Sequence, residues 1–137
     1  VSRHRESFLK LVEDHIDILF ANEDEITTLY KTSSLNTALE ELKKKCDLAA
    51  ITIGEKGSIL ISNGKEIKID PFILGKAIDT TGAGDLYAGA FLKGHADGLK
   101  PELSAKIGSI CAGQIVTQLG SRSNIDLLNL INSHLEL

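Results

Sequence analysis

Short apolar runs alternate with amphipathic segments through the first part of the chain. Apolar positions recur at helical spacing in residues 6–14 and 35–45, and Asn22 begins a third helical segment. Residues 16–21 and 48–53 are short and mostly apolar, which predicts buried strands. Two such strands separated by helices predict a parallel βαβ unit.

The pattern changes after the second strand. Residues 58–62 and 66–69 are apolar or alternate in polarity, and Asn63-Gly64 between them predicts a β-hairpin. Three more helices are expected, at residues 85–95, 102–119 and 125–135. The middle one is rich in small residues, which permit close approach to another helix or to a flat ligand. The expected fold class is therefore α/β, with parallel strands plus a hairpin.

Composition narrows the class of protein. The chain has 137 residues, 42% of them hydrophobic and 25% charged, as in an ordinary globular domain. A net charge of −4 gives no reason to expect a nucleic-acid partner. No apolar run approaches the ~18 residues of a membrane span, so no membrane partner is expected. Cys46 and Cys111 lack paired spacing, which favours reduced thiols and a cytoplasmic location.

Residues 79–85, Asp-Thr-Thr-Gly-Ala-Gly-Asp, are the most informative stretch because they open a predicted helix. Helix N-termini bind anions through unpaired N–H groups and the positive end of the dipole. A carboxylate such as Asp85 is unusual within an anion site unless it has a function there. Phosphoryl transfer supplies one, because amides hold the transferring phosphate while the carboxylate takes a proton from the attacking hydroxyl. The alternative is an ordinary helix start in which Asp85 complements the dipole.

Two better-known phosphate motifs are excluded. The chain contains no GxxxxGK[ST] sequence, so a Walker loop is absent. Counted from Gly82, the third glycine of GxGxxG is replaced by Tyr87, which disfavours a dinucleotide-binding oxidoreductase.

A second candidate, Thr52-Ile53-Gly54-Glu55-Lys56-Gly57, follows the second predicted strand. Its glycines and the Thr52 hydroxyl suit a ligand at the carboxyl end of a parallel strand, where open α/β sheets bind their ligands. The alternative is a plain turn between strands.

A third candidate, Asn22-Glu23-Asp24-Glu25, follows the first predicted strand. Asn22 as N-cap and Glu25 at the third helical position predict a capping box. In the functional interpretation both residues face phosphates and Glu25 supports a hydrated Mg²⁺ ion, which needs only one or two carboxylates. The two interpretations are compatible.

Together and in this order, the three motifs resemble the ribokinase-like carbohydrate kinases, also called the phosphofructokinase-B family. In that family an Asn-x-x-Glu element, a Thr-x-Gly-x-x-Gly element and an Asp-Thr-x-Gly-Ala-Gly-Asp signature follow one another. The chain is similar in detail to the bacterial adenosine-kinase-like subgroup, through DTTGAGDLYAGAFLKG and AGQIVTQLGSR.

The resemblance implies a role for each matched residue. Asp85 would be the base for the acceptor hydroxyl, and the amides of Gly82, Ala83 and Gly84 would form the anion hole. Residues lining the ATP site would be Asn22, Thr52, Gly54 and Gly57. Glu25 would support Mg²⁺ through water, while Asp79 and Thr81 match positions that help to bind K⁺ in some family members.

The resemblance implies a three-layer αβα sandwich of which residues 1–137 are the C-terminal, ATP-binding and catalytic part. The N-terminal half and the lid, which carry most substrate-binding residues, are expected to be absent, so the 137 residues alone are expected to be inactive. Exposed sheet edge and apolar surface would favour self-association or a homodimer.

Two functions stay open at this point. The first is ATP-dependent phosphoryl transfer to a hydroxymethyl group of a sugar or nucleoside. The second is a non-catalytic nucleotide-binding or assembly module on the same scaffold. The acceptor, the K⁺ dependence and the oligomeric state are not readable from these residues.

Overall fold

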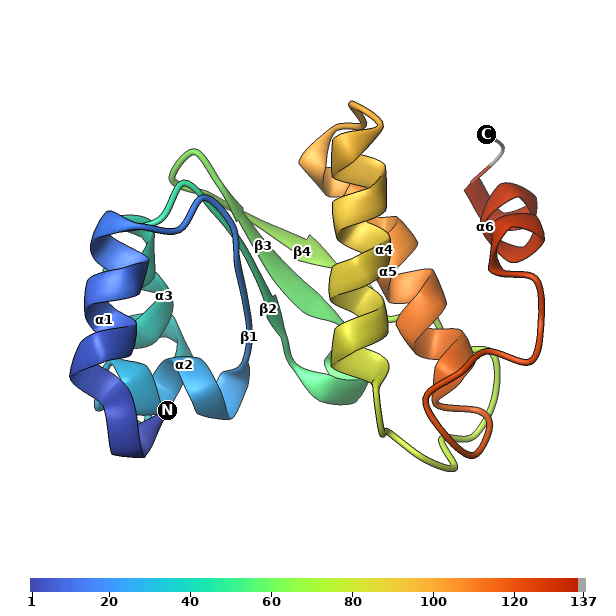
Figure 1. Ribbon diagram of the computed structural model, residues 1–137, viewed down its shortest axis with the longest axis horizontal. Coiled ribbons are helices and arrows are strands. Elements are labelled where there is room, and N and C mark those ends of the chain that lie inside the picture. The colour runs from blue at the N-terminus through green and yellow to red at the C-terminus, as the bar shows by residue number, and fades with distance from the viewer. Residues whose placement is uncertain (136–137) are drawn as a thin grey trace. The chain divides into compact units, whose positions relative to one another are not determined.

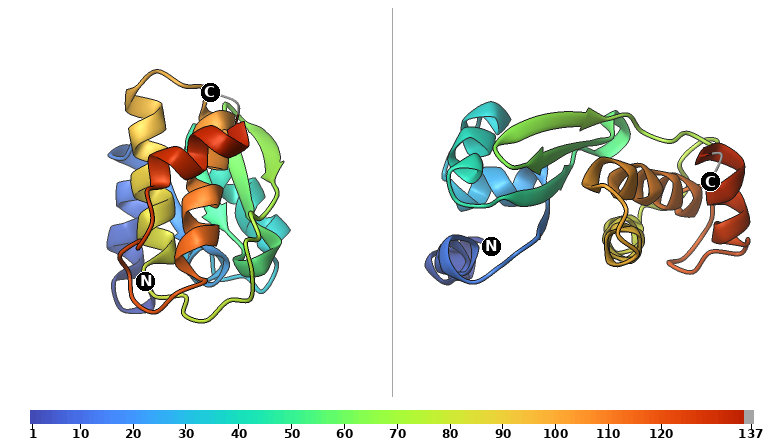
Figure 2. Two further views of the ribbon diagram at one scale, coloured as in Figure 1. Left: turned by 90° about the vertical axis from the view of Figure 1, so that its right-hand side faces the viewer. Right: turned by 90° about the horizontal axis from the view of Figure 1, so that it is seen from above.

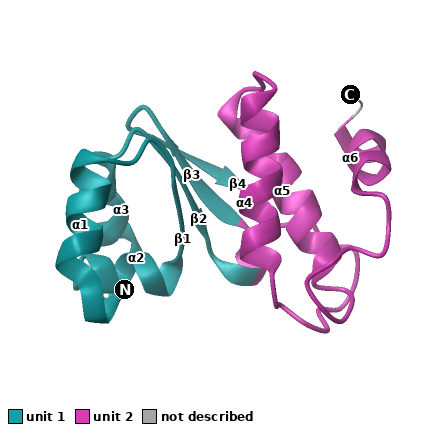
Figure 3. Ribbon diagram, viewed as in Figure 1, with its two compact units in different colours: residues 1–54, 58–68 teal, residues 55–57, 69–137 magenta. Residues whose placement is uncertain are grey.

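The computed structural model describes residues 1–135 and divides into two compact units (Figure 3). Residues 1–54 and 58–68 form the first unit, and residues 55–57 with the chain from residue 69 form the second. The chain combines four strands with helices, so the expected α/β fold class is confirmed.

The first unit is built on a four-stranded sheet in the order β1-β2-β3-β4 (Figure 1). Its elements are η1 (Ser2–His4), α1 (Arg5–Asp14), β1 (Leu19–Asn22), α2 (Glu23–Leu29), α3 (Leu35–Lys43), β2 (Leu48–Thr52), β3 (Ser58–Ser62) and β4 (Lys65–Ile69). Strands β1 and β2 are parallel and are joined through α2 and α3, as the apolar pattern predicted. Strands β2 and β3 are antiparallel, so the sheet is mixed.

The predicted hairpin joins β3 to β4 at Asn63-Gly64. Both residues have positive φ, 49° and 75°, which is the conformation that a tight two-residue hairpin turn requires. In β4 the charged Glu66 and Lys68 are exposed while Ile69 is buried, so one face of this strand meets solvent.

The core of the first unit lies between its helices and one face of the sheet. Ile26 of α2, Leu39 and Leu42 of α3, and Ile51 and Ile61 of the sheet are at most 1% exposed. These side chains come from segments far apart in the sequence, so their burial fixes α2 and α3 against β2 and β3.

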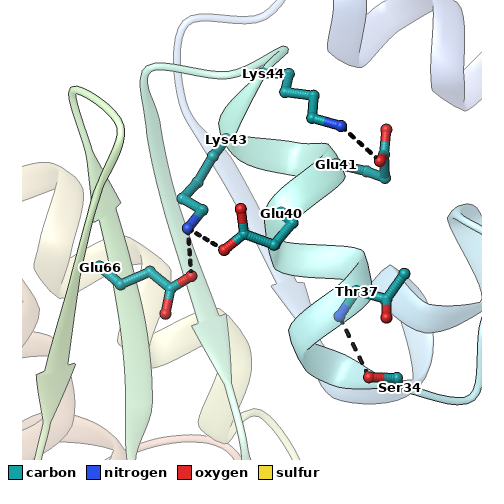
Figure 4. Close-up of polar contacts among 7 residues, drawn as sticks. All are labelled: Ser34, Thr37, Glu40, Glu41, Lys43, Lys44 and Glu66. Carbon is teal, nitrogen blue, oxygen red and sulfur yellow. Dashed lines mark hydrogen bonds and ion pairs between the residues drawn. The ribbon is translucent and has the colours of Figure 1, made fainter.

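Helix α3 is anchored at both ends by polar contacts (Figure 4). The Ser34 hydroxyl accepts a hydrogen bond from the Thr37 amide, which caps the helix N-terminus. At the other end Lys43 contacts Glu40 of its own helix and Glu66 of β4, the latter at 2.9 Å. Surface pairs of this kind contribute ~0–1 kcal/mol each, so the apolar core dominates the stability of this unit.

The second unit contains α4 (Ala83–Ala96), α5 (Pro101–Ile115) and α6 (Leu127–Leu135), preceded by the short turn η2 (Gly54–Lys56) at the start of its sequence range. Helices α4 and α5 lie side by side in every view (Figures 1 and 2). Among residues 1–135 no helix is long and apolar enough to cross a membrane.

Small residues bring α5 close to its neighbours, as predicted. A Cβ at Gly108 would lie 2.9 Å from the Tyr87 carbonyl oxygen of α4. At Gly113 a Cβ would lie 2.0 Å from the carbonyl oxygen of Phe72, a separation that no real contact reaches. The close approach predicted for this helix is therefore to protein backbone.

Several element boundaries differ from the predictions, and for two helices a local reason is visible. The first strand begins at Leu19 rather than residue 16. Helix α5 ends at Ile115 rather than 119, because the Thr117 and Gln118 amides form tighter bonds to carbonyls three residues back. Helix α6 begins at Leu127 because the Asp126 carboxylate accepts from the Leu128 amide and caps it.

Candidate functional site

In the first unit the carboxyl ends of the parallel strands bring two predicted site residues together. Asn22 at the end of β1 and Thr52 at the end of β2 are directly opposite each other in the register. Gly54 follows with φ +60°, and a Cβ there would meet no heavy atom within 4 Å. This edge of the sheet therefore has the open, glycine-containing form that ligand sites of α/β sheets use.

Asn22 and Glu25 form the predicted capping box at the start of α2. The Asn22 Oδ1 accepts from the Glu25 amide at 2.9 Å, and Glu25 Oε2 accepts from the Asn22 amide at 2.8 Å. The cap occupies one side-chain oxygen of each residue, whereas Glu25 Oε1 accepts no hydrogen bond from the described residues. Both side chains are exposed, so the cap leaves Glu25 an oxygen for a hydrated metal ion. Their roles toward phosphate and Mg²⁺ stay predictions.

The second glycine of the Thr52–Gly57 motif has a structural task. Gly57 has φ +93°, and a Cβ there would lie 2.2 Å from the Ile69 carbonyl oxygen and 2.8 Å from the Pro71 nitrogen. Only glycine fits this position. The turn between β2 and β3 therefore accounts for Gly57 without a ligand, and its place in an ATP site stays a prediction.

In the second unit residues 82–85 form the N-terminus of α4. Gly82 is the N-cap, with φ +78°, and no side chain caps the helix. The Ala83 amide donates to the Thr80 carbonyl oxygen at 3.2 Å, so one of the three expected anion-hole amides is already used. Within the described chain the amides of Gly82, Gly84 and Asp85 have no acceptor. These three N–H groups are the ones available to an anion.

Gly84 and Asp85 are exposed at this helix end. A Cβ at Gly84 would meet no heavy atom within 4 Å, so packing does not require glycine there. The Asp85 carboxylate accepts no hydrogen bond from any of residues 1–135. Asp85 is thus held on a regular helix next to free amides, with both oxygens uncommitted.

Asp79 differs from Asp85 because both of its oxygens are engaged. Oδ1 accepts from the Thr81 amide at 2.9 Å, and Oδ2 accepts from the Gly120 amide at 3.0 Å. Hydrogen bonds from the Thr81 hydroxyl, the Thr81 amide and the Gly120 amide hold the pKa of the Asp79 carboxyl below its usual range. No cluster of three metal-ligating side chains is present in the described part of the chain.

Sequence reasoning missed the segment after α5 as a partner of this turn. The Gly120 amide donates to the Asp79 carboxylate, and Gly82 lies against Ser121. The Asp79–Gly120 contact joins residues 41 positions apart, and no spacing rule connects them. The predicted site residues fall into both units, with Asn22, Glu25, Thr52 and Gly54 in the first and the others in the second.

Comparisons with known proteins all indicate the same family. Residues 2–127 match the model of the pfkB family carbohydrate kinases. A nucleoside kinase from Methanocaldococcus jannaschii is 31% identical over 132 residues, which cover 96% of this chain and 43% of that protein. A ribokinase from Lactococcus lactis is 29% identical over 133 residues, covering 96% of this chain and 42% of that protein.

Among solved structures, adenosine kinase from Sinorhizobium meliloti is similar with a TM-score of 0.91 and 38% identity. The match covers 96% of this chain and 40% of that one. The chain thus spans about two fifths of the length of these relatives. The motif order, the α/β fold and these matches agree, and the chain belongs to the pfkB family of carbohydrate kinases.

Proposed function

We propose that this chain is the ATP-binding and catalytic-base part of a kinase that phosphorylates a hydroxymethyl group of a sugar or nucleoside. The observation that carries the proposal is the N-terminus of α4, where the Asp85 carboxylate is exposed and uncommitted beside unpaired amides. The nucleoside kinase, ribokinase and adenosine kinase relatives support this class of acceptor.

In this proposal the free amides of Gly82, Gly84 and Asp85 stabilise the charge that develops on the transferring phosphoryl group. Preorganised donors of this kind lower the barrier because they need no reorientation during the reaction. Asp85 accepts a hydrogen bond from the acceptor hydroxyl and orients it for in-line attack. It takes the hydroxyl proton as the new O–P bond forms and the bond from the γ-phosphorus to the bridging oxygen breaks, which releases ADP.

The residues present also suit ATP and Mg²⁺. The open space at Gly84 admits a phosphate close to the backbone, and Thr52 and Gly54 offer a hydroxyl and an exposed backbone at the end of β2. Glu25 Oε1 has the hard oxygen chemistry that Mg²⁺ prefers, and Mg²⁺ would neutralise phosphate charge. K⁺ at Asp79 and Thr81 stays a prediction, tested by comparing turnover in K⁺ and in tetramethylammonium.

Asp85→Asn tests the catalytic role. In the complete gene product we expect turnover with adenosine or ribose to fall by orders of magnitude, while the ATP dissociation constant from calorimetry changes little. Retained turnover would contradict the assignment of Asp85.

Gly84→Ala tests the phosphate site on the same helix. The fold has room for this methyl group, so we expect unchanged stability with weakened ATP binding. Gly89→Ala is the matched control, because Gly89 also lies in α4 with no atom within 4 Å of a Cβ. Equal ATP binding by both variants would argue against a phosphate at Gly84.

A non-catalytic nucleotide-binding or assembly module is the second candidate. This candidate predicts ATP binding without phosphorylation of either acceptor, and sedimentation would show any homodimer or larger self-association.

A further inference from the structure

The chain leaves β4 through residues 70–75, which lie along one face of α5. The Ser109 hydroxyl of α5 donates to the Asp70 carbonyl oxygen at 2.9 Å and accepts from the Phe72 amide at 3.1 Å. Ser109 is buried, at 7% exposure. One buried hydroxyl therefore satisfies two backbone groups of this segment at the point where the strand has ended.

Two further contacts follow at intervals of one helical turn. A Cβ on Gly113 would lie 2.0 Å from the Phe72 carbonyl oxygen, and a Cβ on Gly75 would lie 3.8 Å from the Thr117 methyl group. Ser109, Gly113 and Thr117 are spaced four residues apart, so they share one face of α5. Hydrogen bonds at one end and close packing along the helix hold the backbone of residues 70–75 against this face.

The same segment carries large apolar side chains that meet solvent. Ile73 is 74% exposed, Leu74 is 45% exposed, and Ile78 nearby is 63% exposed. Neighbouring exposed apolar side chains often mark a binding surface, and ligand sites are lined mainly by apolar groups. The segment leads directly into residues 79–85, which the proposed function assigns to the phosphates, so a nucleotide bound there brings its nucleoside end near this surface.

We propose that Ser109 is a positioning residue that holds Ile73 and Leu74 where they receive the nucleoside part of ATP. Its hydroxyl is committed to the backbone of residues 70–72 and does not itself touch the nucleotide. The inference rests on the proposed function and deepens it, because it separates the residues that serve the nucleoside from those that serve the phosphates. A contact surface on a loop needs such support, since binding groups lose affinity when their supporting contacts are loose.

The test uses the full 137-residue chain, labelled with ¹⁵N and titrated separately with Mg·ATP and with the magnesium complex of inorganic triphosphate. In the wild type we expect the Gly84 and Asp85 amide signals to shift with both ligands. The Ile73 and Leu74 signals should shift with ATP alone, and ATP should bind more tightly than triphosphate.

Ser109→Ala leaves the Asp70 carbonyl and the Phe72 amide without their partner. We expect the affinity for ATP to fall by roughly tenfold, the typical effect of one lost buried partner, with the affinity for triphosphate unchanged. Ser104→Ala is the matched control, because Ser104 is also buried in α5 but donates to the Lys100 carbonyl oxygen one turn back, at 3.3 Å. It should leave both affinities unchanged.

Ile73→Ala is a second variant that leaves the contacts with α5 in place. Its side chain is mostly exposed, so the fold should tolerate the change while ATP binds more weakly and triphosphate binds as before. Leu128→Ala is its control, since Leu128 is 68% exposed on α6 of the same unit. If Ser109→Ala does not fold, the comparison of Ile73→Ala with Leu128→Ala decides the outcome.

The outcomes separate the two proposals. A wild-type chain whose signals ignore both ligands would refute the proposed function and this inference with it. Equal weakening of ATP and triphosphate binding by Ser109→Ala would show a general structural role and overturn the inference alone. Unchanged ATP affinity in Ser109→Ala or Ile73→Ala would overturn it as well, as would an equal loss in Ser104→Ala.

Discussion

Helices α2 and α4 differ in how their N-termini are capped. Each leaves backbone N–H groups unpaired in its first turn. At α2 the Asn22 and Glu25 side chains close the end through a reciprocal pair of hydrogen bonds. At α4 no side chain caps the helix, and Gly82 takes a left-handed conformation instead.

The difference shows how an acidic residue at a helix start can serve two purposes. Glu25 and Asp85 both occupy the third helical position, where a negative charge is favourable. Glu25 turns back to its own N-cap and contributes to folding. Asp85 faces solvent next to free amides, which is the arrangement that the proposed chemistry requires.

The largest stability effect is expected at the uncapped helix. Gly82→Ala adds a Cβ 2.6 Å from that of Ser121 and forces alanine to a φ near +78°. Overpacking and left-handed strain together predict a loss of about 2–4 kcal/mol. Hydrogen exchange of the α4 amides measures this loss within the second unit.

Gly84→Ala is the control for that experiment. It changes the same turn but has open space for its methyl group, and alanine favours helix. Equal losses in the two variants would show that the turn, rather than the contact with Ser121, is sensitive to substitution.

A smaller effect is expected at the capped helix. Asn22→Ala removes the acceptor for the Glu25 amide, which predicts a loss of about 1 kcal/mol. Faster hydrogen exchange in α2 would report it. Asn36→Ala, an exposed asparagine within α3, should leave α2 unchanged. Unchanged α2 protection in Asn22→Ala would mean that the capping box adds nothing to stability.

The smallest effect concerns the other ends of the same two helices, which share one hydrogen-bond pattern. After α2 the Thr32 amide donates to the Thr27 carbonyl oxygen. After α4 the Leu99 amide donates to the Gly94 carbonyl oxygen. The left-handed residue in between is Lys31 at φ 51° in the first case and Gly98 at φ 80° in the second.

Lys31→Gly should therefore stabilise the first unit by about 0.5 kcal/mol, because glycine relieves the left-handed strain at some cost in chain entropy. The reverse test, Gly98→Ala, should destabilise the second unit. The midpoints of urea unfolding measure both changes. Destabilisation by Lys31→Gly would show that the lysine side chain stabilises this turn.

Local contacts explain what could be predicted from the sequence. The capping box joins residues three apart, and the hairpin turn depends on two adjacent residues, Asn63 and Gly64. The parallel pairing of β1 with β2 followed from the apolar runs and the helices between them. The α4 start was predictable because the glycines and Asp85 are contiguous.

Contacts between distant residues explain what could not be predicted. The Asp79 carboxylate accepts from the Gly120 amide 41 positions away, and Gly82 lies against Ser121, with α4 and α5 between them in the sequence. Nothing in the spacing of residues 79–85 distinguishes the engaged Asp79 from the uncommitted Asp85. That distinction depends on the contact of Asp79 with Gly120, which lies far away in the sequence.

The close packing of α5 also has a consequence for how this sequence can change. Every substitution of glycine adds at least a Cβ, and at Gly113 that atom would overlap the Phe72 carbonyl, while at Gly108 it would crowd Tyr87. Every other amino acid has a Cβ, so no substitution at Gly113 avoids this overlap. These two positions therefore restrict the mutational paths open to the helix, whereas Gly84 on α4 is sterically free to vary and would be held constant only by a ligand.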